Sequence, residues 1–219
     1  MIGSVTPQNA SNYILDSLKV AKIIPIVTIR RVTDAVPIVE SLLEGGLTMV
    51  EITLRTRDAL EVIEVVTSRN DIAVAAGTLI YPEDVTKCLN AGVKFGVCPG
   101  TTDELIETCE NKGLPILGGV SSVSEIMRLM NRGYKVMKFF PAEALGGVKT
   151  LKAIGGPLPQ ISFCPTGGIS YFTAQEYLEL PNVIAIGGSW IATEKLIDEG
   201  NWKEIRRLAR EAATLGDTI

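Results

Sequence analysis

Lys138 is the residue whose surroundings point most directly to chemistry. It lies within the apolar stretch 136–141 (VMKFFP). An unpaired ammonium is costly to bury, and burial favours the neutral amine, which is a nucleophile. A lysine of this kind suits Schiff-base formation with a carbonyl substrate. The stretch alone is equally typical of a lysine at a strand end whose stem packs while its head reaches water.

A carboxylate and a guanidinium lie in and just after a second apolar stretch, 49–53 (MVEIT). The alternation around Glu51 points it towards a protein interior, and a buried carboxylate near a lysine is a natural proton shuttle. Arg55 follows the stretch and could hold a carboxylate with two parallel hydrogen bonds. The plainer alternatives are a structural salt bridge for Glu51 and a loop-surface charge for Arg55.

Glycine-rich turns follow three further apolar stretches. Gly77 allows close backbone approach and Thr78 offers a hydroxyl, although this signal is weak by itself. The segments 165–170 (PTGGIS) and 186–190 (IGGSW) each carry a Gly-Gly pair whose backbone N–H groups could bind phosphate. A single Gly-Gly dipeptide, without the second one, would indicate only a tight turn. Phe140-Pro141, after Lys138, could shape a pocket floor or serve only as a rigid turn.

The elements that would position these residues alternate along the chain. Short apolar runs are each followed by an amphipathic helical pattern, and strand starts recur roughly every 20 to 25 residues, which is a βα-unit spacing. We expect strands at 23–29, 49–53, 72–76, 95–98, 115–117, 136–140, 161–165 and 183–186. We expect helices at 34–43, 59–68, 82–90, 103–111, 123–131, 148–154, 173–180, 194–197 and 202–213.

Eight such units without a linker-like change in composition predict an α/β fold, a single (β/α)8 TIM barrel over residues 1–219. Helix starts at Thr33-Asp34, Thr102-Asp103 and Ser122 agree with this pattern. An extra N-terminal helix, at about 9–20, is expected to cover the bottom of the barrel. A doubly wound sheet is less favoured because it would not require eight even units. Chemistry in TIM barrels sits at the C-terminal ends of the strands.

Composition excludes several kinds of site and partner. The chain has no histidine, so a Ser-His-Asp or Cys-His nucleophile system cannot be built, and no metal or other cofactor is expected. Its 21 basic and 25 acidic residues give no basic excess for binding nucleic acid or a membrane surface. We expect no transmembrane helix, no signal peptide and a cytoplasmic location. That location suits reduced thiols at the widely spaced Cys88, Cys98, Cys109 and Cys164.

These motifs together resemble the 2-keto-3-deoxy-6-phosphogluconate (KDPG) aldolases, the bacterial class I enzymes of the Entner–Doudoroff pathway. The resemblance covers about residues 10–215, and its long motifs occur in the expected order. They are VEITLRT at 50–56, AGT at 76–78, KFFPAE at 138–143, CPTGGIS at 164–170 and GGSW at 187–190.

The resemblance implies a Schiff-base aldolase that cleaves the phosphorylated keto acid to pyruvate and glyceraldehyde 3-phosphate. Many members also cleave 4-hydroxy-2-oxoglutarate, and the family is commonly a homotrimer without a metal. By resemblance, Lys138 forms the Schiff base and Glu51 is the general acid and base. The implied substrate contacts are Arg55 and Thr78 at the pyruvate carboxylate, Thr166 and Phe140 in the same pocket, and Gly167, Gly168, Gly187, Gly188 and Ser189 at the phosphate.

Other functions remain as alternatives at this point. The nearest is an aldolase for the galactonate epimer or for non-phosphorylated hydroxy-oxoglutarate. The Gly-Gly pair favours a phosphorylated substrate, and C4 preference depends on pocket geometry. A phosphate-binding isomerase or epimerase barrel would share the Gly-Gly turns without needing a carbonyl-reactive lysine. A non-catalytic sugar-phosphate-binding protein would show no reducible adduct. The sequence also leaves open whether Arg30 or Arg31 reaches the ligand.

Overall fold

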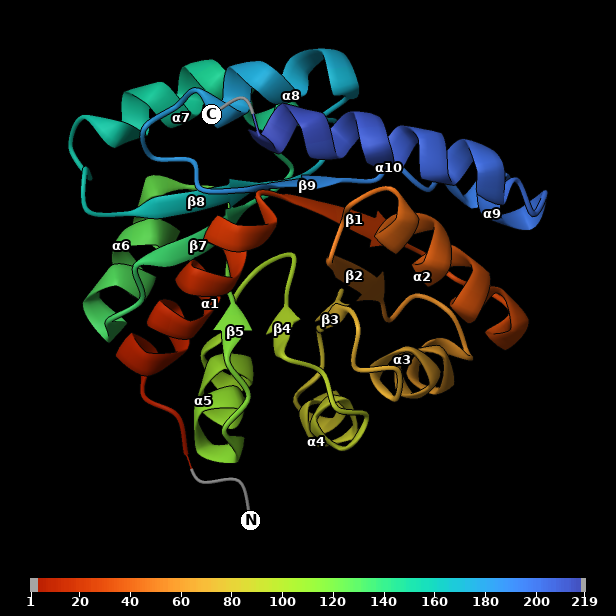
Figure 1. Cartoon of the computed structure of the whole chain (residues 1–219). Coiled ribbons are helices and arrows are strands. Elements are labelled where there is room, and N and C mark those ends of the chain that lie inside the picture. Colours follow the sequence, from red (N-terminus) through yellow and green to blue (C-terminus); the bar gives the residue numbers. More distant parts are fainter. Residues whose placement is uncertain (1–3, 218–219) are drawn as a thin grey trace.

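The computed structural model describes residues 4–217 as parallel strands flanked by helices (Figure 1). The strands are β1 (Ile23–Val27), β2 (Met49–Thr53), β3 (Ala73–Gly77), β4 (Phe95–Val97), β5 (Ile116–Leu117), β6 (Gly119–Val120), β7 (Val136–Phe139), β8 (Ser162–Pro165) and β9 (Ile186–Gly188). The α-helices are α1 (Pro7–Ala21), α2 (Ala35–Glu44), α3 (Ala59–Thr67), α4 (Pro82–Asn90), α5 (Asp103–Lys112), α6 (Val123–Arg132), α7 (Gly147–Gly155), α8 (Tyr171–Leu178), α9 (Glu194–Asp198) and α10 (Trp202–Asp217). Two short 3-10 helices, η1 (Val32–Asp34) and η2 (Glu143–Leu145), lie between them.

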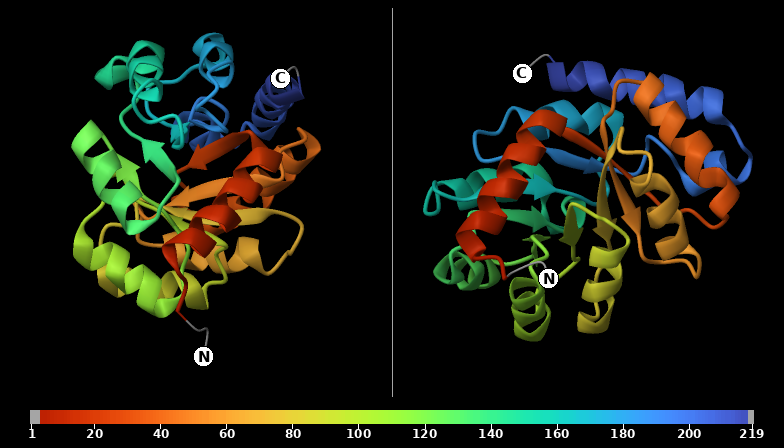
Figure 2. Two further views of the ribbon diagram at one scale, coloured as in Figure 1. Left: turned by 90° about the vertical axis from the view of Figure 1, so that its left-hand side faces the viewer. Right: turned by 60° about the horizontal axis from the view of Figure 1, so that its bottom comes forward.

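The strands form two parallel sheets. One sheet has the order β5-β4-β3-β2-β1-β9 and the other β6-β7-β8. An isolated parallel bridge between Thr166 and Gly187 links the end of β8 to β9. At the other junction a single residue, Gly118, separates β5 from β6. The result is an α/β fold in which most helices lie on the outer side of the curved strands (Figure 2).

Alternation along the strands divides the buried side chains into two clusters. Val50 and Ile52 of β2 belong to the larger cluster, which also contains helix residues such as Leu42. Met49 belongs to a smaller cluster of strand residues, which also includes Ile14 and Leu18 of α1. Successive residues of a strand point to opposite faces. The larger cluster therefore lies between strands and helices, and the smaller lies on the inner face of the strands.

The N-terminal helix α1 agrees closely with the expected 9–20. Thr6 caps it by accepting a hydrogen bond from the backbone N–H of Asn9, and Pro7 occupies the first turn, where no N–H is needed. Its apolar side chains pack against the inner cluster. No helix among residues 4–217 is long and apolar enough to cross a membrane.

The first helix after β1 begins one residue later than expected, at Ala35, with Asp34 at the position before it. Asp34 is also the last residue of η1, and its side chain makes no cap; its carboxylate instead accepts a hydrogen bond from Arg31 Nε at 2.7 Å. The other two expected helix starts are confirmed. Thr102 accepts from the N–H of Leu105, and Ser122 forms a capping box with Glu125.

Several strand boundaries also differ from expectation. Most differ by one residue, but the first strand, expected at 23–29, already ends at Val27, and two later strands differ more. The expected strand at 115–117 is followed by a second short strand because the chain changes partner at Gly118: residues 116–117 pair with β4, whereas residues 119–120 pair with β7. The last strand lies at Ile186–Gly188 instead of 183–186. Val183 makes only an isolated bridge to Phe163, and regular pairing begins where residues 186–188 meet β1.

Candidate active site

Lys138 and Glu51 meet in the interior of the fold. Lys138 Nζ lies 3.1 Å from Glu51 Oε1 and 3.4 Å from Oε2, and each side chain is only 7% exposed. Lys138 comes from β7 and Glu51 from β2, which lie in different sheets. The fold thus brings together a buried amine and a buried carboxylate that are 87 residues apart in the sequence.

The inner face of the strands explains why both side chains point inward. Val136, two residues before Lys138, and Met49, two residues before Glu51, both belong to the inner cluster. Residues of a strand separated by two share a face. The charged pair therefore lies above an apolar floor, where electrostatic interactions are stronger than in water. That floor is lined by Leu18, Ile24, Ala75, Phe95, Val97, Leu117, Cys164 and Gly187.

Gly77 makes room for the carboxylate of Glu51. A Cβ on Gly77 would lie 2.3 Å from Glu51 Oε1 and 2.6 Å from its Cγ. Such contacts are far shorter than van der Waals separation, so any larger residue must displace the Glu51 side chain. Gly77 at the end of β3 is therefore required by the position of Glu51 on the neighbouring strand.

The Gly77→Ala variant tests this steric dependence. We expect kcat to fall by roughly 100-fold if Glu51 moves protons during turnover, because a displacement of about 1 Å of such a group can cost that much. The Gly100→Ala variant is the control, since a Cβ there would meet nothing within 4 Å. Steady-state kinetics on both folded variants measures the effect. Equal activity in the two would contradict the proposed position of Glu51.

Arg55 and Thr78 also come together at the C-terminal ends of β2 and β3. Arg55 Nε donates to Thr78 Oγ1 at 3.1 Å, while its guanidinium is exposed and keeps further donors for a ligand. Thr78 has a φ of +58°, a left-handed conformation that is uncommon for a threonine. Thr78 directly follows Gly77, and Arg55 comes four residues after Glu51, so the pair lies just beyond the C-terminal ends of the strands that carry Gly77 and Glu51.

The Gly167-Gly168 turn is held against the segment that follows Lys138. Glu143 N–H donates to the Gly167 carbonyl at 3.0 Å, and Ala142 N–H donates to that of Thr166 at 2.8 Å. Gly168 has a φ of +81°, and a Cβ there would lie 2.7 Å from Glu143 Cβ. Only glycine suits this position. Gly168 remains exposed, so its backbone is accessible to a ligand.

The second Gly-Gly pair lies beside the first. The Thr166–Gly187 bridge places the two turns at neighbouring strand ends, and Ser189 is exposed just after Gly188. Lys138 Nζ lies over the ring of Phe140, 5.6 Å from its centroid. The structure thus groups the predicted residues around one strand-end site: Lys138, Glu51, Arg55, Thr78, Thr166, Phe140, Gly167, Gly168, Gly187, Gly188 and Ser189.

Some neighbours of this site were missed by the sequence analysis. Tyr177 Oη donates to Glu143 Oε1 at 2.5 Å. This bond holds Glu143, against which the Gly167-Gly168 turn packs. Thr28 and Thr53 form a hydroxyl pair at 2.9 Å. The face shared by Glu51 and Thr53 in the stretch 49–53 is a signal that could have identified Thr53.

Arg30 and Arg31 are both engaged by carboxylates in this structure. Arg30 pairs with Asp198 at 2.7 Å and also with Glu194, both on α9. Arg31 pairs with Asp34 at 2.7 Å. Among residues 4–217, no group of three or more Asp, Glu or Cys side chains is arranged to hold a metal ion.

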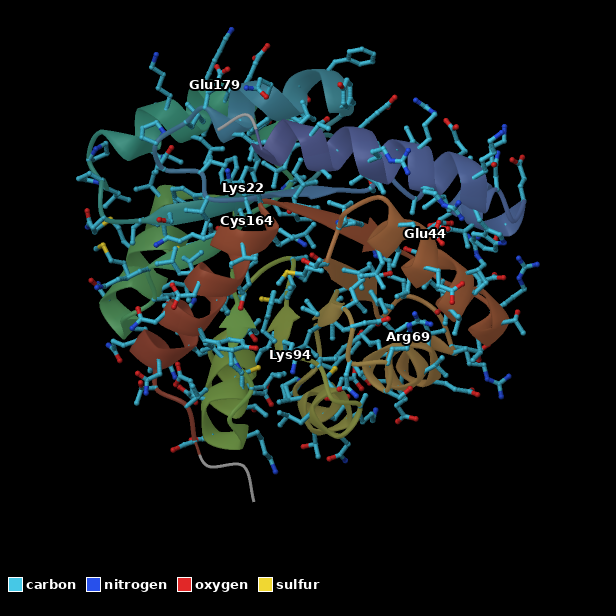
Figure 3. The ribbon with its side chains drawn as sticks, in the orientation of Figure 1. Lys22, Glu44, Arg69, Lys94, Cys164 and Glu179 are labelled. Carbon is cyan, nitrogen blue, oxygen red and sulfur yellow. The ribbon has the colours of Figure 1, made fainter. Side chains whose placement is uncertain are left out.

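The cysteines are all free and buried. Cys164 lies on β8 near the centre of the molecule, whereas Glu179 lies on its outside (Figure 3). Burial raises the pKa of the Cys164 thiol to about 12; Lys138 acts to lower that pKa and Glu51 to raise it further. Burial likewise raises the pKa of Cys88 to about 12. A thiol held in its protonated form is a poor nucleophile.

Thiol titration tests this view of the cysteines. At pH 8 in the native protein we expect none of the four thiols to react rapidly with a disulfide reagent, because burial keeps them protonated and inaccessible. In denaturant all four are expected to react. Rapid loss of Cys164 in the native state, identified by peptide mass, would contradict the prediction.

Comparison with known proteins agrees with this arrangement. Residues 14–208 match the family model "KDPG and KHG aldolase". A 2-dehydro-3-deoxy-phosphogluconate aldolase of Pseudoalteromonas atlantica is 44% identical over 191 residues, covering 87% of this chain and 89% of the relative. The KHG/KDPG aldolase of Escherichia coli K12 is 40% identical over 196 residues, covering 89% and 92%.

A solved structure extends the similarity to three dimensions. The KDPG aldolase of Legionella pneumophila, with pyruvate captured as a covalent carbinolamine intermediate, has a TM-score of 0.86 and 40% sequence identity. The match covers 94% of this chain and 97% of that one. The chain therefore belongs to the family of KDPG and KHG aldolases.

Proposed function

We propose that the chain is a class I aldolase that cleaves 2-dehydro-3-deoxy-6-phosphogluconate, or KDPG, to pyruvate and glyceraldehyde 3-phosphate. The observation that carries the proposal is the buried contact of 3.1 Å between Lys138 Nζ and Glu51 Oε1. It pairs a potential amine nucleophile with a carboxylate that can move protons. The captured carbinolamine of the Legionella relative supports the same chemistry.

The reaction begins with the amine. After a proton leaves the Lys138 ammonium for Glu51 or water, the amine attacks the C2 ketone and forms a carbinolamine. Loss of water gives an iminium. Glu51, directly or through water, takes the C4 hydroxyl proton, and the C3–C4 bond breaks as its electrons move to the iminium and form an enamine. Glyceraldehyde 3-phosphate leaves, the enamine is protonated at C3, and hydrolysis of the new iminium releases pyruvate.

The remaining predicted residues have proposed roles around this pair. Arg55 and Thr78 bind the pyruvate carboxylate; their hydrogen bond and their place just beyond the C-terminal ends of β2 and β3 support this role. The two Gly-Gly turns and Ser189 bind the phosphate, which the adjacent strand ends and the exposed Gly168 and Ser189 support. Thr166 and Phe140 line the space between the phosphate end and Lys138.

A second substrate is supported by one relative. The Escherichia coli protein is named for both KHG and KDPG, so we propose that this chain also cleaves 4-hydroxy-2-oxoglutarate. The test compares kcat/KM for three substrates. They are KDPG, its C4 epimer (the galactonate compound) and 4-hydroxy-2-oxoglutarate. We expect KDPG to give a higher value than 4-hydroxy-2-oxoglutarate, because only KDPG of these two offers a phosphate to the Gly-Gly turns. We expect it also to exceed its C4 epimer, because relatives 44% identical to this chain are named for the gluconate compound. A higher value for the C4 epimer would identify the galactonate aldolase instead.

We also infer that the two sheets close into one (β/α)8 barrel with α1 covering its bottom, and that residues 1–219 form one domain. The bridge between Thr166 and Gly187 and the single residue between β5 and β6 support closure. Ile14 and Leu18 packing against the inner cluster supports the place of α1. One large cluster that draws on segments from Ala10 to Ala212 supports a single domain.

The assembly proposed for this chain is a homotrimer in the cytoplasm. Support for the trimer is the resemblance to a commonly trimeric family, together with large exposed side chains such as Phe172, which is 88% exposed. Size-exclusion chromatography with light scattering should give three times the chain mass, and the mass of a monomer or dimer would contradict the proposal. Free, buried thiols support the cytoplasmic location, where cysteines stay reduced.

A further inference from the structure

Thr28 and Thr53 form a hydroxyl pair one layer above the catalytic carboxylate. Their Oγ1 atoms lie 2.9 Å apart. In the parallel pairing of β1 and β2, Ile26 is opposite Glu51 and Val27 is opposite Ile52, so Thr28 stands opposite Thr53. Thr53 is two residues after Glu51 and therefore on the same inner face, nearer the C-terminal end of the strand.

Thr28, like Thr53, lies on the inner face of its strand. Ile24 belongs to the inner cluster, whereas Val27 and Ile29 belong to the outer one, so Ile24, Ile26 and Thr28 point inward. Ile26 Cδ1 would lie only 2.8 Å from a Cβ on Gly187, which places this face against the second Gly-Gly pair. Thr28 is only half-buried although it faces inward, so it borders a space that opens to solvent.

The pair has hydrogen-bonding capacity to spare. Each hydroxyl has one proton to donate and two lone pairs to accept. The contact between Thr28 and Thr53 uses one proton, and within residues 4–217 neither hydroxyl has another hydrogen-bond partner. Thr53 is 1% exposed, so its hydroxyl is shielded from water. Of the two hydroxyl protons in the pair, one therefore remains for a ligand.

The order of the strands determines which part of the substrate passes this pair. Strand β1 lies between β9, which carries the proposed phosphate turn, and β2, which carries Glu51. In the proposed reaction the C4 hydroxyl is at Glu51 and the phosphate on C6 is at Gly187-Gly188. Carbon 5 joins these two points, so its hydroxyl passes the inner face of β1, where Thr28 lies.

We propose that the Thr28–Thr53 pair binds the C5 hydroxyl of the substrate, which is the C2 hydroxyl of glyceraldehyde 3-phosphate in the reverse direction. Thr28 makes the contact, and Thr53 orients it. The pair thereby selects aldehydes that carry a hydroxyl beside the carbonyl. This inference rests on the proposed aldolase function and adds a specificity-determining contact to it.

The test removes the hydroxyl from the enzyme and from the substrate separately. Wild type, Thr28→Val and Thr28→Ser are compared in the condensation of pyruvate with glyceraldehyde 3-phosphate and with 3-oxopropyl phosphate, which lacks the C2 hydroxyl. In Thr28→Val we expect kcat/KM for glyceraldehyde 3-phosphate to fall about 3- to 10-fold, the value of one neutral hydrogen bond. The value for 3-oxopropyl phosphate should stay unchanged, and Thr28→Ser should keep the wild-type ratio.

The Thr56→Val variant is the matched control. Thr56 Oγ1 already donates to the carbonyl of Ile29 at 2.7 Å, so loss of that hydroxyl should change both aldehydes by the same factor. An equal fall for both aldehydes in Thr28→Val would overturn the inference, as would a wild type without preference for glyceraldehyde 3-phosphate over 3-oxopropyl phosphate. If Thr28→Val does not fold, Thr53→Val replaces it with the same expected pattern.

Failure of the aldolase function itself would look different. A wild type that condenses pyruvate with neither aldehyde would contradict the proposed function. A wild type that condenses both, with a ratio unaffected by Thr28→Val, would contradict only the role of the hydroxyl pair.

Discussion

The Lys138→Ala variant is expected to lose KDPG cleavage completely and to form no adduct with pyruvate. The amine of Lys138 is the only proposed covalent link to the substrate, and in the described part of the chain it is the lysine in contact with Glu51. Without the iminium there is no electron acceptor for the C3–C4 bond. The measurement is a lactate dehydrogenase-coupled assay of pyruvate release, run at high enzyme concentration.

Stability must be controlled in this experiment. The substitution leaves Glu51, only 7% exposed, without its partner, and breaking a buried pair in this way costs about 3–5 kcal/mol of the free energy of unfolding. The double variant Lys138→Ala with Glu51→Gln removes both charges and should recover part of that loss. Both variants should be inactive, although only the single one is strongly destabilised. Near-normal cleavage by folded Lys138→Ala would contradict the mechanism.

The Glu51→Gln variant is expected to slow cleavage while keeping the covalent step. Glutamine has nearly the same shape as glutamate but cannot take the C4 hydroxyl proton, so kcat should fall by about 10²- to 10⁴-fold, the usual contribution of general base catalysis. The substitution leaves the amine of Lys138, the nucleophile of the covalent step, in place. Lys138 should therefore still form an imine with pyruvate.

Two readouts separate these effects. Pyruvate release measures kcat, and borohydride reduction followed by peptide mass measures the imine on Lys138. The Glu64→Gln variant is the control, since Glu64 lies on the solvent side of α3 and is outside the site. Unchanged kcat in Glu51→Gln would exclude Glu51 as the proton acceptor. Loss of the adduct together with activity would show that the carboxylate is needed earlier, for formation of the imine.

Much of the fold was predictable because its signals are local. Helix α4 lies at Pro82–Asn90 and strand β2 at Met49–Thr53, both as expected, because hydrophobic period and terminal residues mark them within a few positions. The left-handed glycines that end α5 and α6 are equally local. The pair of Lys138 and Glu51 was also foreseeable, since each charge interrupts an apolar strand.

The differences between expectation and structure arise where pairing between distant segments determines a strand boundary or a side-chain contact. The last strand begins at Ile186 because its partner changes from Phe163 of β8 to Ile23 of β1, and no residue near 183–188 signals that change. Thr28 and Thr53 are 25 residues apart, and Glu143 and Tyr177 are 34 apart. Each contact depends on strand register or helix placement, which one sequence does not contain as a local pattern.

The most direct test of the Schiff-base mechanism is borohydride reduction of the wild-type protein in the presence of pyruvate, followed by intact and peptide mass. The mechanism predicts one N-(1-carboxyethyl) group per chain, located on Lys138 in the peptide that contains residues 136–141. The adduct should be absent without pyruvate and absent in Lys138→Ala. A folded protein that gives no adduct, or an adduct on another lysine, would contradict the central claim.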